Sequence, residues 1–206
     1  MKLRVNPNRM ELLRLRRRLA IAKRGHKLLK DKQDALIKRF IELARESKRL
    51  REELEKELQK AYGSFLGARA IMSSRSLEEA LLISGIRSQL KVSMINMMSV
   101  LVPQFEFLYE GDPANYGFWE TSGELDLALY TFINFLQKLI KLAQMEKAVV
   151  LLADEIEKTR RRVNALEYVL IPALEETISF IKMKLDEMER STLTRLMKIK
   201  EIVRKH

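Results

Sequence analysis

The chain has 206 residues, a net charge of +11, no cysteine and two histidines, His26 and His206. The lack of cysteine excludes disulfides and thiolate chemistry, and two histidines are too few for a structural zinc site. Hydrophobic residues make up 47% of the chain, enough for a buried core, yet no apolar stretch reaches the roughly 20 residues that a membrane-spanning helix needs.

A long helix is predicted from about residue 8 to residue 62. Asn8 and Glu11 have the spacing of a helix N-cap, in which the Asn side chain accepts from free backbone amides. From Leu12 to Leu54 the positions of one face alternate at spacings of three and four residues, which is typical of a coiled-coil seam. We expect the helix to end before Gly63.

The middle of the chain, residues 63–123, is predicted to form a small mixed head. Six of the seven glycines and eight of the fourteen aromatic residues lie within residues 62–123. A short helix is expected near Leu77–Ile83. The β-branched and aromatic residues of 91–95 and 98–107 favour a β-hairpin or an irregular extended pair.

A second long helix is predicted over residues 124–206. Its seam runs from Leu142 to Leu170, shifts by four residues to Leu174, and continues to Ile202. The shift coincides with Pro172, which lacks a backbone N–H, so we expect the helix to bend there.

The two long helices and the head predict a mainly α protein, a long antiparallel two-helix coiled coil. If residue 10 faces residues 198–200, several opposite charges meet across the seam. The acidic residues Asp186, Glu187 and Glu189 then lie near Lys23 and Arg24. The same register predicts inter-helix pairing of Glu52 and Glu53 with Arg160, Arg161 and Arg162.

No pattern in the chain indicates a catalytic residue, a cofactor site or a metal site. His26 has only cationic sequence neighbours and is interpreted as a packed seam residue. The segment Gly63–Gly67 lacks the Lys-Ser/Thr of a phosphate loop. The aromatics of the head lie in acidic sequence, which favours core packing or a protein interface over base stacking: Phe105, Phe107, Tyr109, Phe118 and Trp119.

Three segments carry a family resemblance. Residues 6–15 (NPNRMELLRL), 24–32 (RGHKLLKDK) and 158–167 (KTRRRVNALE, followed by Ile171-Pro172) resemble the D subunit of V-type and archaeal-type ATP synthases. Shorter similarities lie at residues 98–103 and 123–126. The resemblance covers both helices nearly from end to end and is weak in the head.

The resemblance implies a cytoplasmic, non-catalytic central rotor shaft in a membrane-bound complex. Its implied partners are the catalytic A and regulatory B subunits, the small F subunit of the stalk, and the funnel-shaped subunit of the membrane ring. The basic tip, residues 9–24 with residues 190–205, is then expected to contact the catalytic hexamer. The interface residues assigned on this basis are Arg9, Arg14, Arg16, Arg17, Arg24, Arg195 and Lys198.

The charge distribution leaves a rival open. Residues 1–60 carry 20 Lys or Arg against 9 Asp or Glu, and such an end could bind nucleic acid as a basic coiled-coil scaffold. For residues 16–18 a solvated flank and a phosphate contact are equally compatible with the sequence. A membrane-surface helix fits less well, because the apolar stripe is a narrow seam suited to a partner helix.

Overall fold

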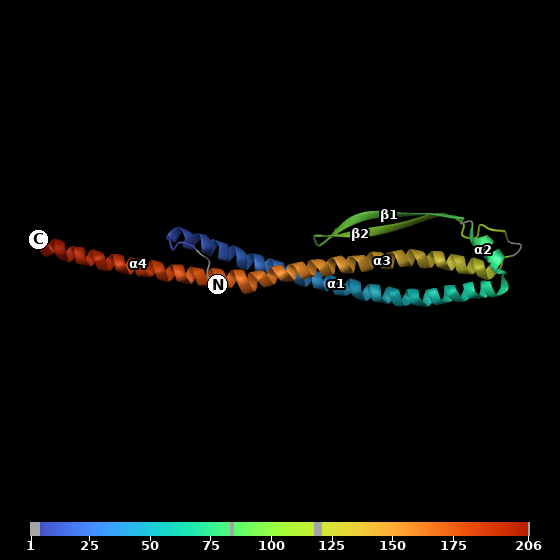
Figure 1. Ribbon diagram of the computed structural model, residues 1–206, viewed down its shortest axis with the longest axis horizontal. Coiled ribbons are helices and arrows are strands. Elements are labelled where there is room, and N and C mark those ends of the chain that lie inside the picture. Colours follow the sequence, from blue (N-terminus) through green and yellow to red (C-terminus); the bar gives the residue numbers. More distant parts are fainter. Residues whose placement is uncertain (1–4, 83–84, 118–120, 206) are drawn as a thin grey trace. The chain divides into compact units, whose positions relative to one another are not determined.

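The computed structural model describes residues 5–82, 85–117 and 121–205. The elements, in chain order, are α1 (Arg9–Ile71), α2 (Ser74–Leu82), β1 (Ile86–Met97), β2 (Val100–Gly111), α3 (Gly123–Asn164), a π-helix η1 (Ala165–Leu170) and α4 (Ile171–Lys205) (Figure 1). They divide into two compact units, residues 1–35 with 156–206, and residues 36–155. The predicted mainly α fold with a helical hairpin and a small β-hairpin is confirmed.

The beginning of α1 follows the predicted capping pattern. The backbone N–H of Glu11 donates to Asn8 Oδ1 at 2.7 Å, and the N–H of Leu12 donates to the Asn8 carbonyl at 3.1 Å. The first bond satisfies an amide that a helix start would otherwise leave free, and the second is the first regular backbone bond of the helix. The helix therefore begins at Arg9, one residue from its predicted position.

The end of α1 differs from the prediction, since the helix continues through Gly63 and Gly67 to Ile71. Two glycines inside a helix cost about 2 kcal/mol relative to alanine. Burial offsets this cost: Ala61 and Ala68 are fully buried, and Ala68 packs in a cluster with Leu125 of α3. The limits 1–62, 63–123 and 124–206 stay a prediction as domain boundaries, although α3 does begin at Gly123.

The unit of residues 36–155 contains the head. Here α1 and α3 run antiparallel (Figure 1). Arg51 of α1 pairs with Glu146 of α3, and Glu57 of α1 pairs with Lys138 of α3. The predicted short helix is present as α2; Ile83, the last residue of that prediction, lies outside the described residues. A buried cluster joins α2 to the ends of α1 and α3: Ala68, Met72, Leu77, Ala80 and Leu125.

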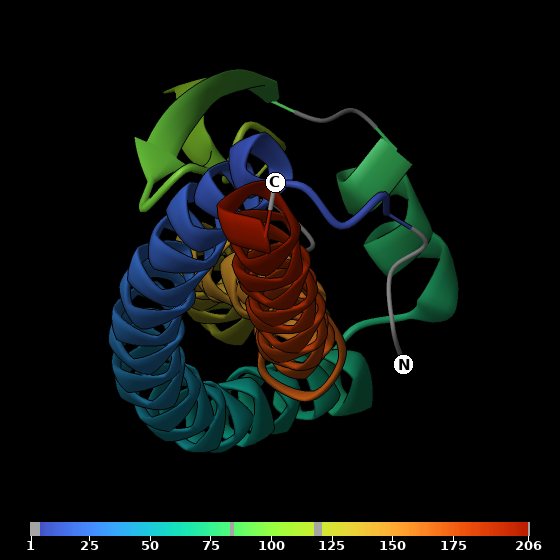
Figure 2. The same cartoon turned by 90° about the vertical axis from the view of Figure 1, so that its left-hand side faces the viewer.

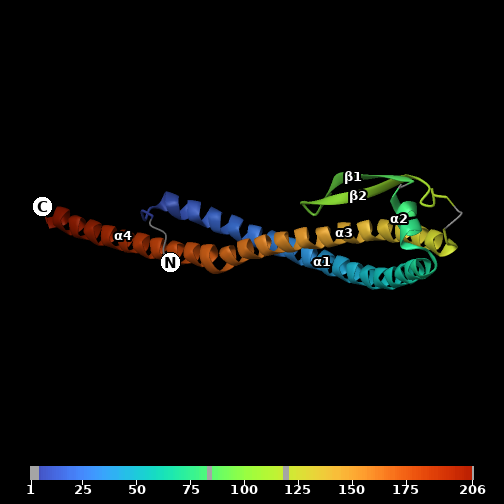
Figure 3. The same cartoon turned by 45° about the vertical axis from the view of Figure 1, so that its right-hand side comes forward.

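The β-hairpin in the same unit has regular antiparallel pairing from Ile86↔Gly111 to Met97↔Val100. Its two-residue loop, Met98 and Ser99, has φ angles of 54° and 70°, the conformation of a type I′ turn. Asn96 Oδ1 accepts from the Ser99 N–H at 2.9 Å and supports the turn. The strands lie along α3, on the side away from this part of α1 (Figures 1, 2 and 3).

Glycine is required where the hairpin joins the head. A Cβ on Gly85 would lie 2.2 Å from the carbonyl oxygen of Asp112, and Gly111 has a φ of +111°. Only glycine tolerates both the contact and the positive φ without strain. The chain can therefore return from β2 towards α3 close to its own backbone.

The unit of residues 1–35 and 156–206 is built on one apolar seam between α1 and α4. Leu15, Ala22, Leu174 and Ile181 form its buried cluster. The π-helix η1 precedes Pro172, where the sequence shows its four-residue shift, and the Ile171 N–H bonds to the Leu166 carbonyl, five residues back. The four-residue shift of the seam thus coincides with the end of a π-helical segment, which accommodates an extra residue without breaking the helix, while the bend expected at Pro172 stays a prediction.

The helix register differs from the expected one by about three turns. Glu189, expected near Lys23 and Arg24, pairs with Arg9, while Lys23 pairs with Glu175 at 2.7 Å. The prediction aligned the two chain ends, whereas the observed antiparallel pairing buries Leu15, Ala22, Leu174 and Ile181 in one seam. The expected proximity of residue 10 to residues 198–200 was therefore wrong.

Candidate interaction surface at the basic tip

The first turns of α1 present exposed cations on a helix whose opposite side packs in the seam. Arg9 pairs with Glu189, and Arg14 lies 3.7 Å from Glu11. Arg16, Arg17 and Arg24 are exposed and take part in none of the ion pairs between described residues. The sequence-predicted interface residues of α1 are therefore accessible to an external partner.

Apolar side chains lie among these arginines. Met10 is 79% exposed and Ile21 is 69% exposed, although long apolar side chains are usually buried. They line a shallow groove on α1 together with Leu13, Arg14, Arg17, Arg18 and Glu11. A surface that alternates cations with exposed apolar side chains suits a protein partner better than the phosphate backbone of a nucleic acid.

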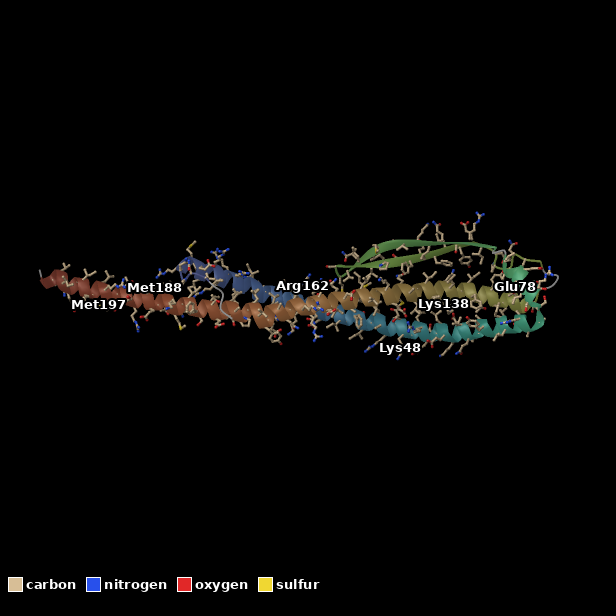
Figure 4. All side chains as sticks on the ribbon, in the orientation of Figure 1. Lys48, Glu78, Lys138, Arg162, Met188 and Met197 are labelled. Atoms are coloured by element: carbon tan, nitrogen blue, oxygen red, sulfur yellow. The ribbon has the colours of Figure 1, made fainter. Side chains whose placement is uncertain are left out.

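The end of α4 forms a second part of this surface. We define residues 190–204 as the C-terminal extension, in which every side chain from Thr192 to Arg204 is exposed. Arg195 and Lys198 line one shallow groove on it, with Glu187, Arg190, Ser191, Thr194 and Ile199. Figure 4 marks Met188 and Met197 along this part of α4.

The seam positions of the C-terminal extension explain why it is exposed. The predicted seam is buried or half-buried as far as Leu185, but Met188, Thr192, Ile199 and Ile202 are all exposed. Because the register is shifted, the described part of α1 begins at the level of Glu189 and covers nothing beyond it. An apolar seam without a covering helix indicates an interaction site.

The five residues predicted to pair between the helices lie on α1 (Glu52 and Glu53) and on α3 (Arg160, Arg161 and Arg162). Glu52 lies 4.0 Å from Lys48, and Glu53 lies 3.3 Å from Arg49, both on α1. Arg161 pairs with Glu157 on α3, and Arg160 and Arg162 are exposed. In each unit the observed cross-helix pairs join other residues: Arg9–Glu189, Lys23–Glu175, Arg51–Glu146 and Lys138–Glu57.

His26 contacts an acidic residue that lies far from it in the sequence, although its sequence neighbours are cationic. Its Nε2 atom lies 3.3 Å from Glu167 Oε2, on the π-helix η1, and the side chain is half-buried. The prediction of a packed seam residue agrees with this position. Among the described residues no group of three His, Cys, Asp or Glu could hold a metal ion.

A polar network in the head was missed by the sequence interpretation. The Tyr116 hydroxyl donates to Asp126, and the Tyr130 hydroxyl donates to Asp112 Oδ1 at 2.8 Å. Burial raises the pKa of Tyr116, and the Asp126 carboxylate raises it further. The Ala114 N–H, and then the Tyr130 hydroxyl, lower the pKa of Asp112. The network ties the loop after β2 to α3; the only sequence signal was the GELD string that contains Asp126.

None of the helices in the described part of the chain combines the length and the apolar character needed to cross a bilayer.

Comparison with known proteins gives one consistent result. Residues 11–201 match the model of a family described as the D subunit of ATP synthase. The chain is 57% identical over 204 residues to the V-type ATP synthase D subunit of Thermoanaerobacter sp. (strain X514), covering 98% of this chain and 97% of that protein. It is 57% identical over 205 residues to the V-type ATP synthase D subunit of Acetivibrio thermocellus, and the match covers 98% of this chain and 92% of that protein. It is 56% identical over 208 residues to the V-type ATP synthase D subunit of Clostridium botulinum (strain ATCC 19397 / Type A), and the match covers 98% of this chain and 96% of that protein. Over nearly its whole length, therefore, this chain belongs to the family of ATP synthase D subunits and is a subunit of a V-type ATP synthase.

Proposed function

We propose that this subunit is the non-catalytic central rotor shaft of its ATP synthase and transmits torque between the membrane ion-driven ring and the catalytic hexamer. The observation that carries the proposal is the exposed basic and apolar surface of α1 and the C-terminal extension, which no described part of the chain covers. The protein acts from the cytoplasmic, peripheral part of the membrane-bound complex.

The antiparallel helix pairing in each unit suits a shaft mechanically. Two helices that share a packed seam resist bending and twisting better than one helix, because a deformation of either must displace buried side chains of both. In the unit of residues 1–35 and 156–206 these are Leu15, Ala22, Leu174 and Ile181. A torque applied to one helix is then carried by the other.

The basic tip is the proposed contact with the catalytic A and regulatory B subunits. A helix pair lacks threefold symmetry, so each orientation presents different side chains to three otherwise equivalent catalytic sites. Differential contact of this kind shifts conformational populations, which is what an effector must do to change nucleotide affinity at one site at a time. The shaft needs no reactive group of its own for this role.

The small F subunit is proposed to bind at the head and the neighbouring part of α3. The funnel-shaped subunit is proposed to bind the end of the shaft that faces the membrane ring, away from the catalytic hexamer. Support comes from the first part of α3, where large apolar side chains remain exposed: Leu127, Tyr130, Leu136 and Leu139. Exposed apolar side chains that lie close together on a surface mark an interaction site, so a further protein surface is expected to cover them.

Charge reversal tests the proposal. The triple variant Arg14→Glu, Arg16→Glu and Arg17→Glu is expected to lower assembly with the catalytic hexamer at least tenfold, or to uncouple ATP hydrolysis from ion pumping. A matched control, Lys158→Glu with Arg160→Glu and Arg162→Glu, makes the same charge change at exposed positions of α3 and is expected to assemble normally. Unchanged assembly and ATP-driven pumping in the first variant would contradict the proposal.

The molecules that co-purify with the chain distinguish the rotor shaft from the nucleic-acid scaffold. That rival predicts retention of DNA or RNA with a steep dependence on ionic strength. The shaft predicts co-purification with nucleotide-binding subunits and no nucleic acid.

A further inference from the structure

On each strand of the β-hairpin, the pairing register identifies the residues whose backbone N–H and C=O groups point away from the other strand. A two-residue loop closes on a hydrogen-bonded pair, here Met97↔Val100, and bonded and non-bonded pairs alternate from there. On β1 the backbone groups that point away from β2 therefore belong to residues 88, 90, 92, 94 and 96. On β2 they belong to residues 101, 103, 105, 107 and 109.

The outer edge of β2 is protected against further pairing. Pro103 has no N–H to offer. The Phe105 N–H donates to Gln144 Oε1 of α3 at 3.0 Å, which confirms that this amide points outwards from the hairpin. Figure 1 shows β2 next to α3, with β1 on the far side.

The outer edge of β1 lacks every one of these protections. The sheet has two strands, so among the described residues β1 pairs with β2 alone, and all side chains from Arg87 to Asn96 are exposed. Three of the five residues with outward backbone groups are apolar: Leu90, Val92 and Met94 are 49%, 57% and 65% exposed. A long, exposed, apolar edge is a template for another strand.

We propose that an extended segment of a neighbouring subunit adds to β1 as a third, hydrogen-bonded strand. The free row of backbone N–H and C=O groups selects an extended backbone, and Leu90, Val92 and Met94 select apolar side chains at alternate positions of that strand. The inference rests on the proposed function, since the neighbour is a member of the assembled complex.

Charge decides against a second copy of this chain as the occupant. β1 carries Arg87 and Lys91 and no acidic residue, so two β1 strands side by side would bring like charges together. In the hairpin the same two cations lie opposite Glu110 and Glu106 of β2. The incoming strand is expected to carry acidic residues at the positions between its apolar ones.

Hydrogen exchange at single amides tests this pairing. In the complex purified from native cells, the amides of Leu90, Val92 and Met94 are expected to exchange at least tenfold more slowly than in the isolated chain. The inward amides of Lys91, Ser93 and Ile95 bond to β2 in both samples and serve as the internal control. Equal exchange of the outward amides in the two samples would overturn the inference.

A variant pair makes the test specific to the backbone. Val92→Pro removes one outward N–H and leaves the hairpin ladder complete, just as Pro103 does on β2. It is expected to abolish the protection of Leu90 and Met94 in the complex, while Val92→Thr, which keeps the N–H, retains it. Retained protection in Val92→Pro would overturn strand addition.

Two further outcomes separate this inference from the proposed function. A complex that forms while the β1 edge stays unprotected overturns strand addition alone, whereas a chain that does not co-purify with nucleotide-binding subunits overturns both. Protection that appears in the isolated chain and disappears on dilution would show a second copy as the occupant and would also overturn the inference.

Discussion

Leu174 and Leu193 lie on the same helix in opposite environments. Leu174 is fully buried in the cluster with Leu15, Ala22 and Ile181, whereas Leu193 is 56% exposed in the C-terminal extension. At the scale of single residues this contrast separates side chains that hold the fold from those that remain for a partner.

Truncating these two leucines should give very different losses of stability. Leu174→Ala is expected to lower the free energy of unfolding by about 2–5 kcal/mol, because it removes buried methyl groups and leaves a cavity. Leu193→Ala, the matched control, is expected to change it by less than about 0.5 kcal/mol. Denaturant unfolding of both variants measures the difference, and equal losses would show that the seam does not stop near Leu185.

The tyrosine and aspartate network of the head makes a prediction for pH. The pKa of Tyr116 is raised, so its contribution to stability is present below about pH 10, the ordinary tyrosine value, and is lost as the pH rises through the higher folded value. The pKa of Asp112 is lowered, so its contribution is present above about pH 4 and is lost as the pH falls through the lower folded value.

Tyrosinate absorbance, followed as the pH is raised, tests the raised pKa of Tyr116. With Tyr116→Phe as the subtraction reference, Asp126→Asn is expected to lower the pH at which Tyr116 ionises, since the carboxylate that opposes the phenolate charge is gone. Glu124→Gln removes a carboxylate two residues before Asp126 in the sequence, one that does not contribute to the raised pKa of Tyr116, and should have a much smaller effect. An unchanged titration in Asp126→Asn would argue that burial alone raises the pKa.

At the scale of elements, the π-helix η1 separates two regular α-helices that share one seam. Thr159 and Val163 before it and Leu174 and Thr177 after it are all buried. A π-helical turn holds one residue more than an α-helical turn, so it corrects the phase of the buried face across the four-residue shift. The residues of η1 itself contribute no buried side chain.

Single-residue deletions distinguish this element from its neighbours. Deletion of Val169, an exposed residue of η1, is expected to convert the π-turn into an α-turn and to leave the melting temperature within a few degrees of the parent. Deletion of Ala153, also exposed but in regular α3, should rotate the following seam by about 100° and lower the melting temperature strongly. Circular dichroism follows both; similar losses would contradict the proposed role of η1.

At the scale of the whole molecule, folding and assembly use different parts of the chain. The buried clusters lie in the α1–α4 seam before Leu185 and in the head, whereas the C-terminal extension adds no buried side chain beyond Arg190 except the half-buried Ser191. Stability therefore should not depend on the C-terminal extension.

Removal of residues 191–206 tests this separation. The shortened chain is expected to unfold at nearly the same temperature as the full chain, since no buried seam residue is lost. Its binding to the catalytic hexamer should fall at least tenfold, because Arg195, Lys198 and the exposed apolar face are absent. Pull-down with the A and B subunits provides the measurement, and full binding by the shortened chain would place the hexamer contact elsewhere.

Local patterns in the sequence were sufficient for the elements themselves. The Asn8 cap, the alternating seams as far as Leu185 and the β-hairpin each depend on residues close together in the chain, and each is present in the structure. The cationic candidates of the basic tip followed from composition and from the family resemblance, and the structure shows that they are exposed.

The register of the helices and the length of the C-terminal extension depend on contacts between residues far apart in the chain. The apolar positions of each helix recur every three or four residues, so several alignments of the two helices satisfy the pattern, and opposite charges such as Glu189 and Lys23 could be matched in one that the chain does not adopt. The alignment in the structure has α1 continuing through Gly63, Lys23 pairing with Glu175, and the seam of α4 exposed beyond Leu185. Local residue patterns thus establish which faces of the helices are apolar, while packing between distant segments establishes which of those faces the protein covers with its own chain.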